Sequence, residues 1–144
     1  MTFALDLQKF AEKTADKAND AVGSIVIRVA QEVDKRSPVG DAAFWQSPPP
    51  KGYVGGRFRA NWQLGISGLP AGIINAADPS GSVTVARIIG EVPQEAAGKV
   101  YYIANNLPYA NRIENGWSRQ APAGVVGLTA TMFQTIVDDA VGQL

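Results

Sequence analysis

The sequence contains neither cysteine nor histidine. Without cysteine the chain can form no disulfide bond and no thiolate metal site. Without histidine it lacks the commonest general base, the commonest zinc ligand and every histidine-dependent catalytic triad. The carboxylates are scattered, and the neighbours Asp138 and Asp139 diverge on a helix. We therefore expect no enzyme activity, no cofactor and no metal site. The alternative hypothesis, an enzyme with a carboxylate-bound metal, is tested by metal analysis of the purified protein.

An excess of charge of one sign is also missing, because thirteen basic and thirteen acidic residues give a formal net charge of zero. A protein that binds nucleic acid tightly usually carries a basic excess, since its affinity comes from neutralised phosphates. Residues 1–13 carry acids and lysines too early for a secretory signal. No window approaches the roughly 18 uninterrupted apolar residues of a membrane span. We expect a soluble protein with no membrane partner.

The length of 144 residues predicts a single domain over residues 1–144. A chain of this size can remove roughly two-thirds of its surface from water on folding. The apolar fraction of 46% is ordinary for a globular protein, so a sizeable core is expected.

The longest periodic segment is 3–35, and its pattern predicts an amphipathic helix. The members of its stripe recur at spacings of three and four: Phe3, Leu7, Phe10, Thr14, Ala18, Ala21, Ile25, Val29 and Val33. Pro38 follows closely, and the residue before a proline resists helical angles. Such a helix would measure roughly 50 Å, more than the roughly 35–40 Å of a compact domain of this size. We therefore expect either a break within 19–24 around Gly23, or one end that overhangs its own domain and needs a partner.

Residues 41–56 contain three consecutive prolines, several glycines and no periodicity, which predicts a long Pro/Gly-rich loop. Three aromatic residues, Phe44, Trp45 and Tyr53, are costly in a loop that contacts nothing, and Trp45 is the expected anchor. The loop is interpreted as an extended arm over a neighbouring subunit or over its own sheet. The alternative is a polyproline ligand for an aromatic groove on another protein.

The predicted fold class is α+β, in which the N-terminal helix and a C-terminal helix pack on an antiparallel sheet of three or four strands. The expected strands are 57–67, 82–92 and 99–105, with 71–76 as an optional fourth. The segment 82–92 is rich in β-branched residues, which favour strands.

Residues 57–67 alternate in a way that is typical of a strand with one buried face. The side chains expected to face the core are Phe58, Ala60, Trp62, Leu64 and Ile66. Arg57 and Arg59 then lie on the solvated face together with Asn61. These arginines are expected to contact acidic neighbours or solvent, or alternatively DNA phosphates.

The stretch 99–126 is predicted to organise the chain. After the strand and a turn, Tyr109 and Ile113 are four residues apart, which stacks them on one face of a short helix. Gly116 stands where a helix C-terminal cap belongs, since glycine enters the left-handed conformation without steric cost. Trp117 is expected to pack against the helix that Gly116 ends. Pro122 is expected to begin a second helix with a broad apolar face that runs to about residue 141.

Arg112 and Glu114 are the charged residues of this stretch that invite a functional interpretation. They could form an ion pair across subunits that fixes a ring. They could equally form a pair on the surface of their own helix or a cap contact, worth at most about 1 kcal/mol if exposed.

The string LPYANRIENGWSRQAPAGVV, residues 107–126, resembles the signature of a family of small neck proteins of tailed bacteriophages, the tail-completion or head–tail joining proteins. SPVG at 37–40 followed by GRFRANW at 56–62 supports the resemblance. In the family these two pieces usually form one continuous motif that ends in Thr-Gly-Arg and runs into a strand. Here residues 41–55 intervene, and Gly55 stands where threonine is common.

The resemblance implies a structural virion protein of the phage neck, assembled in the host cytoplasm. It would form part of a homo-oligomeric head–tail connector ring that completes the tail and joins it to the capsid. The implied partners are further copies of the chain and other neck, connector and tail proteins, while double-stranded DNA passes through the channel without sequence-specific binding. A balanced charge suits a conduit along which DNA must slide.

Two other functions stay open. Within the same class, the chain could be the tail terminator protein that caps the tail tube. From a different class, it could be a nucleic-acid-binding module that uses Arg57, Arg59, Arg87, Lys99 and Arg112 on one face. The candidate interface or structural-motif residues are Phe44, Trp45, Tyr53, Arg57, Arg59, Trp62, Tyr109, Arg112, Glu114, Gly116, Trp117 and Pro122.

Overall fold

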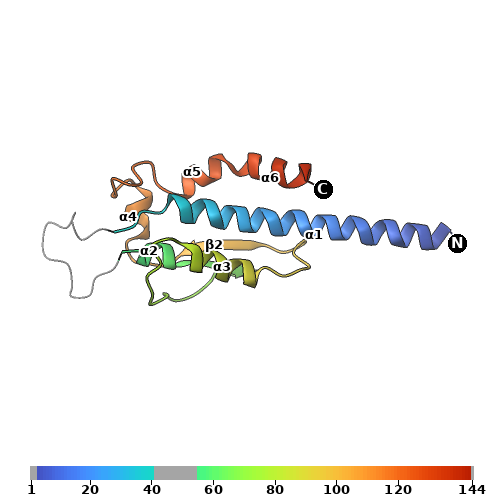
Figure 1. Cartoon of the computed structure of the whole chain (residues 1–144), viewed down its shortest axis with the longest axis horizontal. Coiled ribbons are helices and arrows are strands. Elements are labelled where there is room, and N and C mark those ends of the chain that lie inside the picture. The colour runs from blue at the N-terminus through green and yellow to red at the C-terminus, as the bar shows by residue number, and fades with distance from the viewer. Residues whose placement is uncertain (1–2, 41–54, 144) are drawn as a thin grey trace, which may run out of the picture.

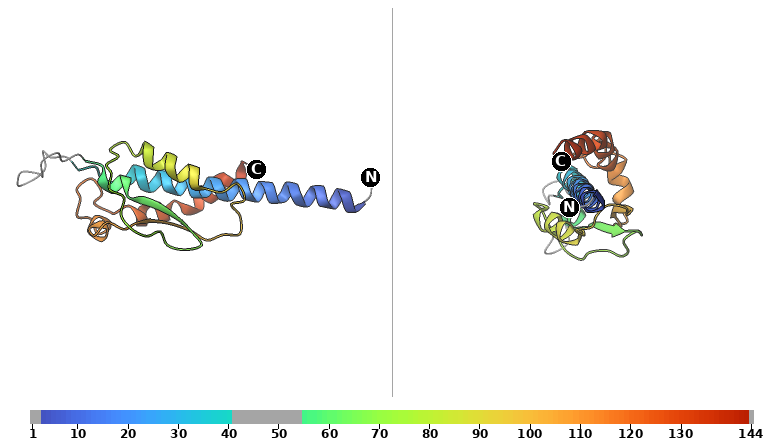
Figure 2. Two further views of the ribbon diagram at one scale, coloured as in Figure 1. Left: turned by 90° about the horizontal axis from the view of Figure 1, so that it is seen from below. Right: turned by 90° about the vertical axis from the view of Figure 1, so that its right-hand side faces the viewer.

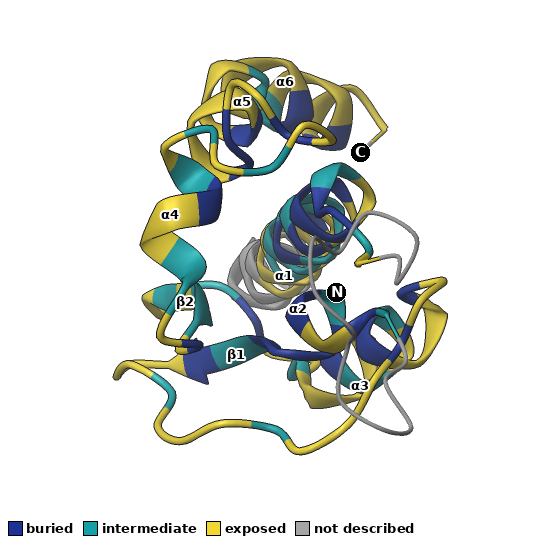
Figure 3. Cartoon of the chain, turned by 90° about the vertical axis from the view of Figure 1, so that its left-hand side faces the viewer, coloured by how far each residue is buried: buried dark blue, intermediate teal, exposed yellow. Residues whose placement is uncertain are grey.

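The computed structural model describes residues 3–40 and 55–143, with side-chain surroundings from residue 12 onward. In chain order the elements are α1 (Phe3–Arg36), α2 (Arg57–Ala60), β1 (Trp62–Ile66), α3 (Ser82–Glu91), β2 (Tyr101–Asn105), α4 (Ala110–Glu114), α5 (Val126–Thr131) and α6 (Phe133–Gly142). Helix α1 lies between α5 and α6 on one side and the sheet with α3 on the other (Figures 1 and 3). The fold is therefore α+β, as predicted.

Helix α1 is one continuous helix of 34 residues and does not break at Gly23. Gly23 faces the end of α3, where an added Cβ would meet Val92 at an ordinary contact distance of 3.8 Å. Residues 12–18 are all exposed, and full burial begins at Ala21. The N-terminal part of α1 consequently projects past every other element of the fold (Figures 1 and 2). The sequence predicted either a break in this helix or an end that overhangs the domain, and the structure has the overhanging end.

The predicted stop of this helix is confirmed at Ser37. The Ser37 N–H donates to the Asp34 carbonyl at 3.1 Å, and its hydroxyl donates to the Val33 carbonyl at 2.6 Å. These two bonds satisfy carbonyls that have no partner inside the helix. The chain therefore leaves α1 at a defined angle toward Pro38.

In the described part of the chain the sheet has two strands, not three or four. Strands β1 and β2 pair antiparallel, with Trp62 opposite Asn105 and Ile66 opposite Tyr101. Residues 71–76 form no strand. The prediction of a larger sheet is wrong because its other members are helical or irregular.

Strand β1 covers only the second half of the predicted strand 57–67, because the first half is the short helix α2. Phe58, Ala60 and Trp62 are buried as predicted, whereas Ile66 is 39% exposed. Asn61 was expected on the solvated face, yet it is completely buried. Its amide group pairs with the backbone of Ile74, accepting the N–H at 2.8 Å and donating to the carbonyl at 3.0 Å.

The predicted strand 82–92 is wrong as well, since residues 82–91 form α3. The Asp78 carboxylate accepts hydrogen bonds from the backbone N–H and the hydroxyl of Thr84, both at 2.8 Å. Thr84 and Ile88, one turn apart, are the buried residues of the helix. An N-terminal carboxylate and a buried stripe of helical spacing thus outweigh the strand preference of the β-branched side chains.

The C-terminal helix predicted after Pro122 exists, but it is divided into α5 and α6 at Met132. The hydroxyl of Thr129 donates to the Val125 carbonyl at 2.9 Å, and that of Thr131 donates to the Leu128 carbonyl at 2.6 Å. Such bonds from threonine back to the preceding turn bend helices. The bend keeps α5 and α6 alongside α1 (Figure 1).

One core holds these layers together. Its buried members are Ala30, Val33, Phe58, Trp62, Ile88, Leu107, Ile113, Ala121 and Val125. The core sits toward the C-terminal half of α1, where α2, α4 and β1 meet (Figure 3).

Candidate functional site

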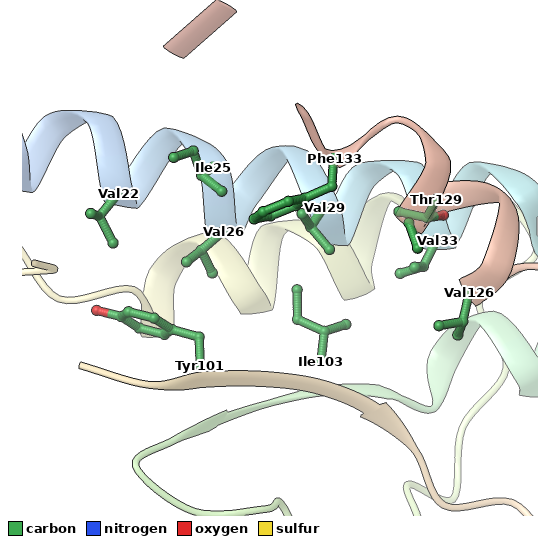
Figure 4. Close-up of a pocket in the computed structure, with 11 residues that line it drawn as sticks. Val22, Ile25, Val26, Val29, Val33, Tyr101, Ile103, Val126, Thr129 and Phe133 are labelled. Atoms are coloured by element: carbon green, nitrogen blue, oxygen red, sulfur yellow. The ribbon is translucent and has the colours of Figure 1, made fainter. Parts of the chain in front are cut away.

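A long apolar groove lies between α1, β2 and the start of the C-terminal helices, with a volume of about 500 Å³. Its lining residues are Val22, Ile25, Val26, Val29, Val33, Tyr101, Ile103, Val126, Thr129, Ala130 and Phe133. Helical spacing along α1 and strand alternation in β2 bring these side chains to one place. Tyr101 and Ile103 point from β2 toward α1, while Phe133 lies beside Val29 (Figure 4).

The groove is open to water rather than filled by its own walls. Val126 is 50% exposed and Phe133 is 49% exposed, although both are large apolar residues. Val22, Ile25 and Val29 are only partly buried. Because burial of exposed apolar surface is favourable, the groove is the candidate binding surface of the described chain.

The polar atoms of the groove walls are already engaged. The Thr129 hydroxyl donates to the Val125 carbonyl at 2.9 Å. The Tyr101 hydroxyl donates to the Ala96 carbonyl at 2.5 Å, and burial raises the pKa of Tyr101. No lining side chain carries a charge. The groove therefore suits an apolar partner.

Glu114 positions the wall that α5 contributes. Its carboxylate accepts hydrogen bonds from the backbone N–H groups of Val125 at 3.0 Å, Val126 at 2.8 Å and Gly127 at 2.9 Å. Burial acts to raise the pKa of Glu114, but these three bonds outweigh it and hold the pKa below its usual value. Of the interpretations that the sequence left open for Glu114, the structure has a cap contact, made on α5 and not on its own helix.

Gly116 directly follows Asn115, the C-cap residue of α4, and has the left-handed conformation that was predicted for the end of this helix, with φ of 86°. The N–H of Trp117 bonds to the Arg112 carbonyl at 3.0 Å, and the N–H of Gly116 bonds to the Ile113 carbonyl at 3.1 Å. This is the hydrogen-bond pattern of a Schellman motif. A side chain at position 116 would also come within 2.6 Å of the Pro122 carbonyl oxygen. Only glycine fits this close approach.

Trp117 was predicted to pack against α4, and it contacts that helix at Arg112 while the residue stays 75% exposed. The Arg112 guanidinium carbon lies 5.5 Å from the centre of its ring, a cation–π contact. Arg112 therefore contacts Trp117 and not an acidic partner within the described chain. Pro122 is exposed, in the turn before α5, and does not begin the helix.

Two arginines that were candidates for DNA contacts bond to the backbone instead. Arg59 donates to the carbonyls of Ser37 at 3.1 Å, Pro79 at 2.9 Å and Lys35 at 3.3 Å. Arg87 donates to the Trp62 carbonyl at 2.7 Å. Two further residues of the predicted basic face are Lys99 and Arg57. Lys99 donates to the Glu95 carbonyl, and Arg57 is exposed at the start of α2.

Trp62 and Tyr109 are packing residues. The Trp62 ring meets Phe58 edge-on at 5.5 Å, and its Nε1 donates to the Ser37 hydroxyl at 2.7 Å. Tyr109 lies 6.4 Å from Phe58, measured between ring centres. The predicted loop residues Phe44, Trp45 and Tyr53 lie outside the described residues.

Sequence reasoning did not find the buried carboxylates Asp34 and Asp78. The pKa of Asp34 is raised to about 6, mainly by burial, which outweighs the attraction of Arg59. One of its oxygens, Oδ1, is buried without a hydrogen-bond partner among the described residues. For Asp78, burial is outweighed by the bonds from Thr84, which hold the pKa below its usual value. The Asp-Pro-Ser-Gly sequence before α3, typical of a helix start, was the available signal.

Residues 3–40 and 55–143 contain no group of three or more acidic side chains arranged to hold a metal ion. None of the helices described there is long and apolar enough to cross a membrane. Comparison of the chain with protein-family models, with curated proteins and with solved structures finds no match.

Proposed function

We propose that the chain is a structural subunit of the neck of a tailed bacteriophage. Copies of it form part of the head–tail connector ring that completes the tail and joins it to the DNA-filled capsid. The role requires surfaces for assembly and no catalytic group, which agrees with a sequence that lacks cysteine and histidine.

The observation that carries this proposal is the open apolar groove beside the overhanging part of α1. A lone monomer leaves the groove in water, although burial of apolar surface is favourable by about 25 cal/mol per Å². A subunit of a larger assembly buries the groove against a neighbour. The two surfaces lie along one helix, so that one copy has both a projecting part and a receiving part (Figures 1 and 4).

The sequence supports the same proposal through the motifs at 37–40 with 56–62 and at 107–126. Residues of both motifs have definite structural roles in this fold: Trp62 bonds to Ser37, and Glu114 bonds to Val125. The Gln120 side chain also exchanges hydrogen bonds with the backbone N–H and carbonyl of Val39, so the two motifs are parts of one packed unit around the end of α1. A balanced net charge also suits a ring through which DNA slides.

Immunogold labelling of particles of the phage that encodes the chain tests the proposal. We expect the label at the junction of head and tail, and the chain among the proteins of purified particles. Label on headless tails as well as on whole particles would favour the tail terminator within the same class. Absence of the chain from purified particles, although infected cells produce it, would overturn the proposal.

A further inference from the structure

The overhang of α1 and the apolar groove belong to the same molecule but cannot meet within it. Val22 to Val33 line the groove, and the overhang is the N-terminal continuation of the same unbroken helix. A helix of 34 residues cannot fold its first turns back onto its own later turns without losing backbone hydrogen bonds. The overhang therefore points away from the groove that its own helix lines (Figures 1 and 2). Only a second molecule can bring the two together.

The sequence of the overhang fits a groove of this kind. Phe3, Leu7 and Phe10 stand at positions i, i+4 and i+7, the spacing by which an amphipathic helix places its anchors in a hydrophobic groove. The stripe continues to Thr14 in the sequence.

The lengths of the two surfaces agree. Position 14 lies eleven residue steps after position 3, and Val33 lies eleven residue steps after Val22. At 1.5 Å per residue both surfaces are about 17 Å long. The occupant therefore covers the groove from one end to the other.

We propose that the N-terminal part of α1, residues 3–14, docks in the apolar groove of a second copy of this chain. Each copy then both donates a helix and receives one. If each copy passes its helix to the next, the contact is heterologous, and such contacts close into rings when the rotation allows. This inference rests on the proposed function, since it names the contact by which neck subunits associate.

Mixed disulfide formation between single-cysteine variants tests the contact, because the natural chain has no cysteine of its own. Leu7→Cys labels the donated helix, and Val126→Cys labels the wall of the groove. Val83→Cys is the matched control, because Val83 is 71% exposed on α3 and does not line the groove. The two partners are purified separately, mixed at equal concentration and oxidised briefly.

We expect a Leu7→Cys and Val126→Cys heterodimer at a yield more than about tenfold above that of Leu7→Cys with Val83→Cys, because docking raises the effective concentration of the thiols. Leu7→Asp in the donor should abolish association measured by light scattering. Its circular dichroism should stay unchanged, since the substitution lies in the part of α1 that projects past the other elements of the fold.

The outcomes separate this inference from the proposed function. Equal yields for Val126→Cys and Val83→Cys, or an oligomer that Leu7→Asp leaves intact, would overturn the inference even if immunogold label were found at the neck. Association through a different neck protein, with no disulfide between copies, would overturn it too. A specific disulfide in a protein absent from phage particles would support the docking contact and contradict the neck function.

Discussion

The carboxylate of Glu114 accepts a hydrogen bond from the backbone N–H of Val125 at 3.0 Å, across eleven residues of sequence. The bond closes the turn that contains Trp117 and Pro122, and it fixes the point at which α5 begins. Because Val126 follows directly and lines the groove, the position of one groove wall depends on Glu114. The side chain of Glu114 thus connects the motif at 107–126 with the wall of the apolar groove.

Replacement of Glu114 by alanine should lower the free energy of unfolding by about 1–2 kcal/mol, the usual cost of losing a side-chain cap. The measurement is urea denaturation followed by circular dichroism. Glu91→Ala is the control, since Glu91 is exposed and forms an ion pair with Arg87 on the same helix, at 3.8 Å. Equal effects of the two substitutions would contradict the role assigned to Glu114.

Replacement of Gly116 by alanine should destabilise the fold by at least about 1–2 kcal/mol, the cost of the left-handed conformation for a residue with Cβ. The close Pro122 carbonyl adds to that cost. Gly90→Ala should have the opposite sign and stabilise by about 0.5–1 kcal/mol, because it lies within α3 and an added Cβ meets nothing within 4 Å. Thermal unfolding of the two variants side by side checks both signs.

Arg59→Ala should cost about 2–3 kcal/mol, since three backbone carbonyls lose a charged donor. Arg59→Lys should recover only part of the loss, because an ammonium cannot reproduce the planar fork of a guanidinium. Arg57→Ala, two residues away and exposed, should change stability by less than about 0.5 kcal/mol. An Arg59→Ala variant as stable as Arg57→Ala would show that the three bonds do not hold the end of α1.

The pKa of Asp34, raised to about 6, predicts a specific pH dependence. A carboxyl whose pKa is higher in the folded than in the unfolded protein favours folding when protonated. Its contribution is complete below the unfolded value of 3.8 and is lost as pH rises from there to about 6. Asp34→Asn should therefore be more stable than the natural chain at pH 7 and less sensitive to pH between about 4 and 6.

Glu114 and Asp78 act in the opposite direction. Their pKa values are lowered by hydrogen bonds, so their contributions are present above the unfolded values of 4.5 and 3.8 and are lost as pH falls below them. Urea denaturation of the natural chain and of Asp34→Asn across this range separates the two effects. A variant whose stability follows that of the natural chain at every pH would contradict the raised pKa of Asp34.

The sequence predicted the features that depend on local chemistry. The stripe of α1, its end before Pro38 and the cap at Gly116 follow from spacing, proline sterics and glycine conformation. Strand β2 followed from alternation within 99–105. In these segments the backbone conformation that the local sequence favours is also the one found in the folded chain.

The predictions from the sequence were wrong where contacts with other segments of the same chain determine the local structure. Residues 82–91 prefer strands by composition, yet the Asp78 carboxylate and the surface of α1 make them helical. The alternation within 57–67 places Asn61 on the solvated face, whereas in the folded chain its amide is hydrogen-bonded to the backbone of Ile74. The groove could not be predicted from the sequence, because Ile103 and Phe133 come next to α1 only when the chain packs.

The molar mass of the purified full chain, measured by light scattering from about 1 to 100 µM, tests the central claim most directly. If the groove and the overhang are assembly surfaces, the mass should rise above the monomer value of 15.2 kDa toward a fixed multiple as concentration increases. Phe133→Asp, in the groove, should shift this rise to higher concentration, while Val83→Asp should not. A mass of 15.2 kDa at every concentration, for the natural chain and both variants, would contradict the account.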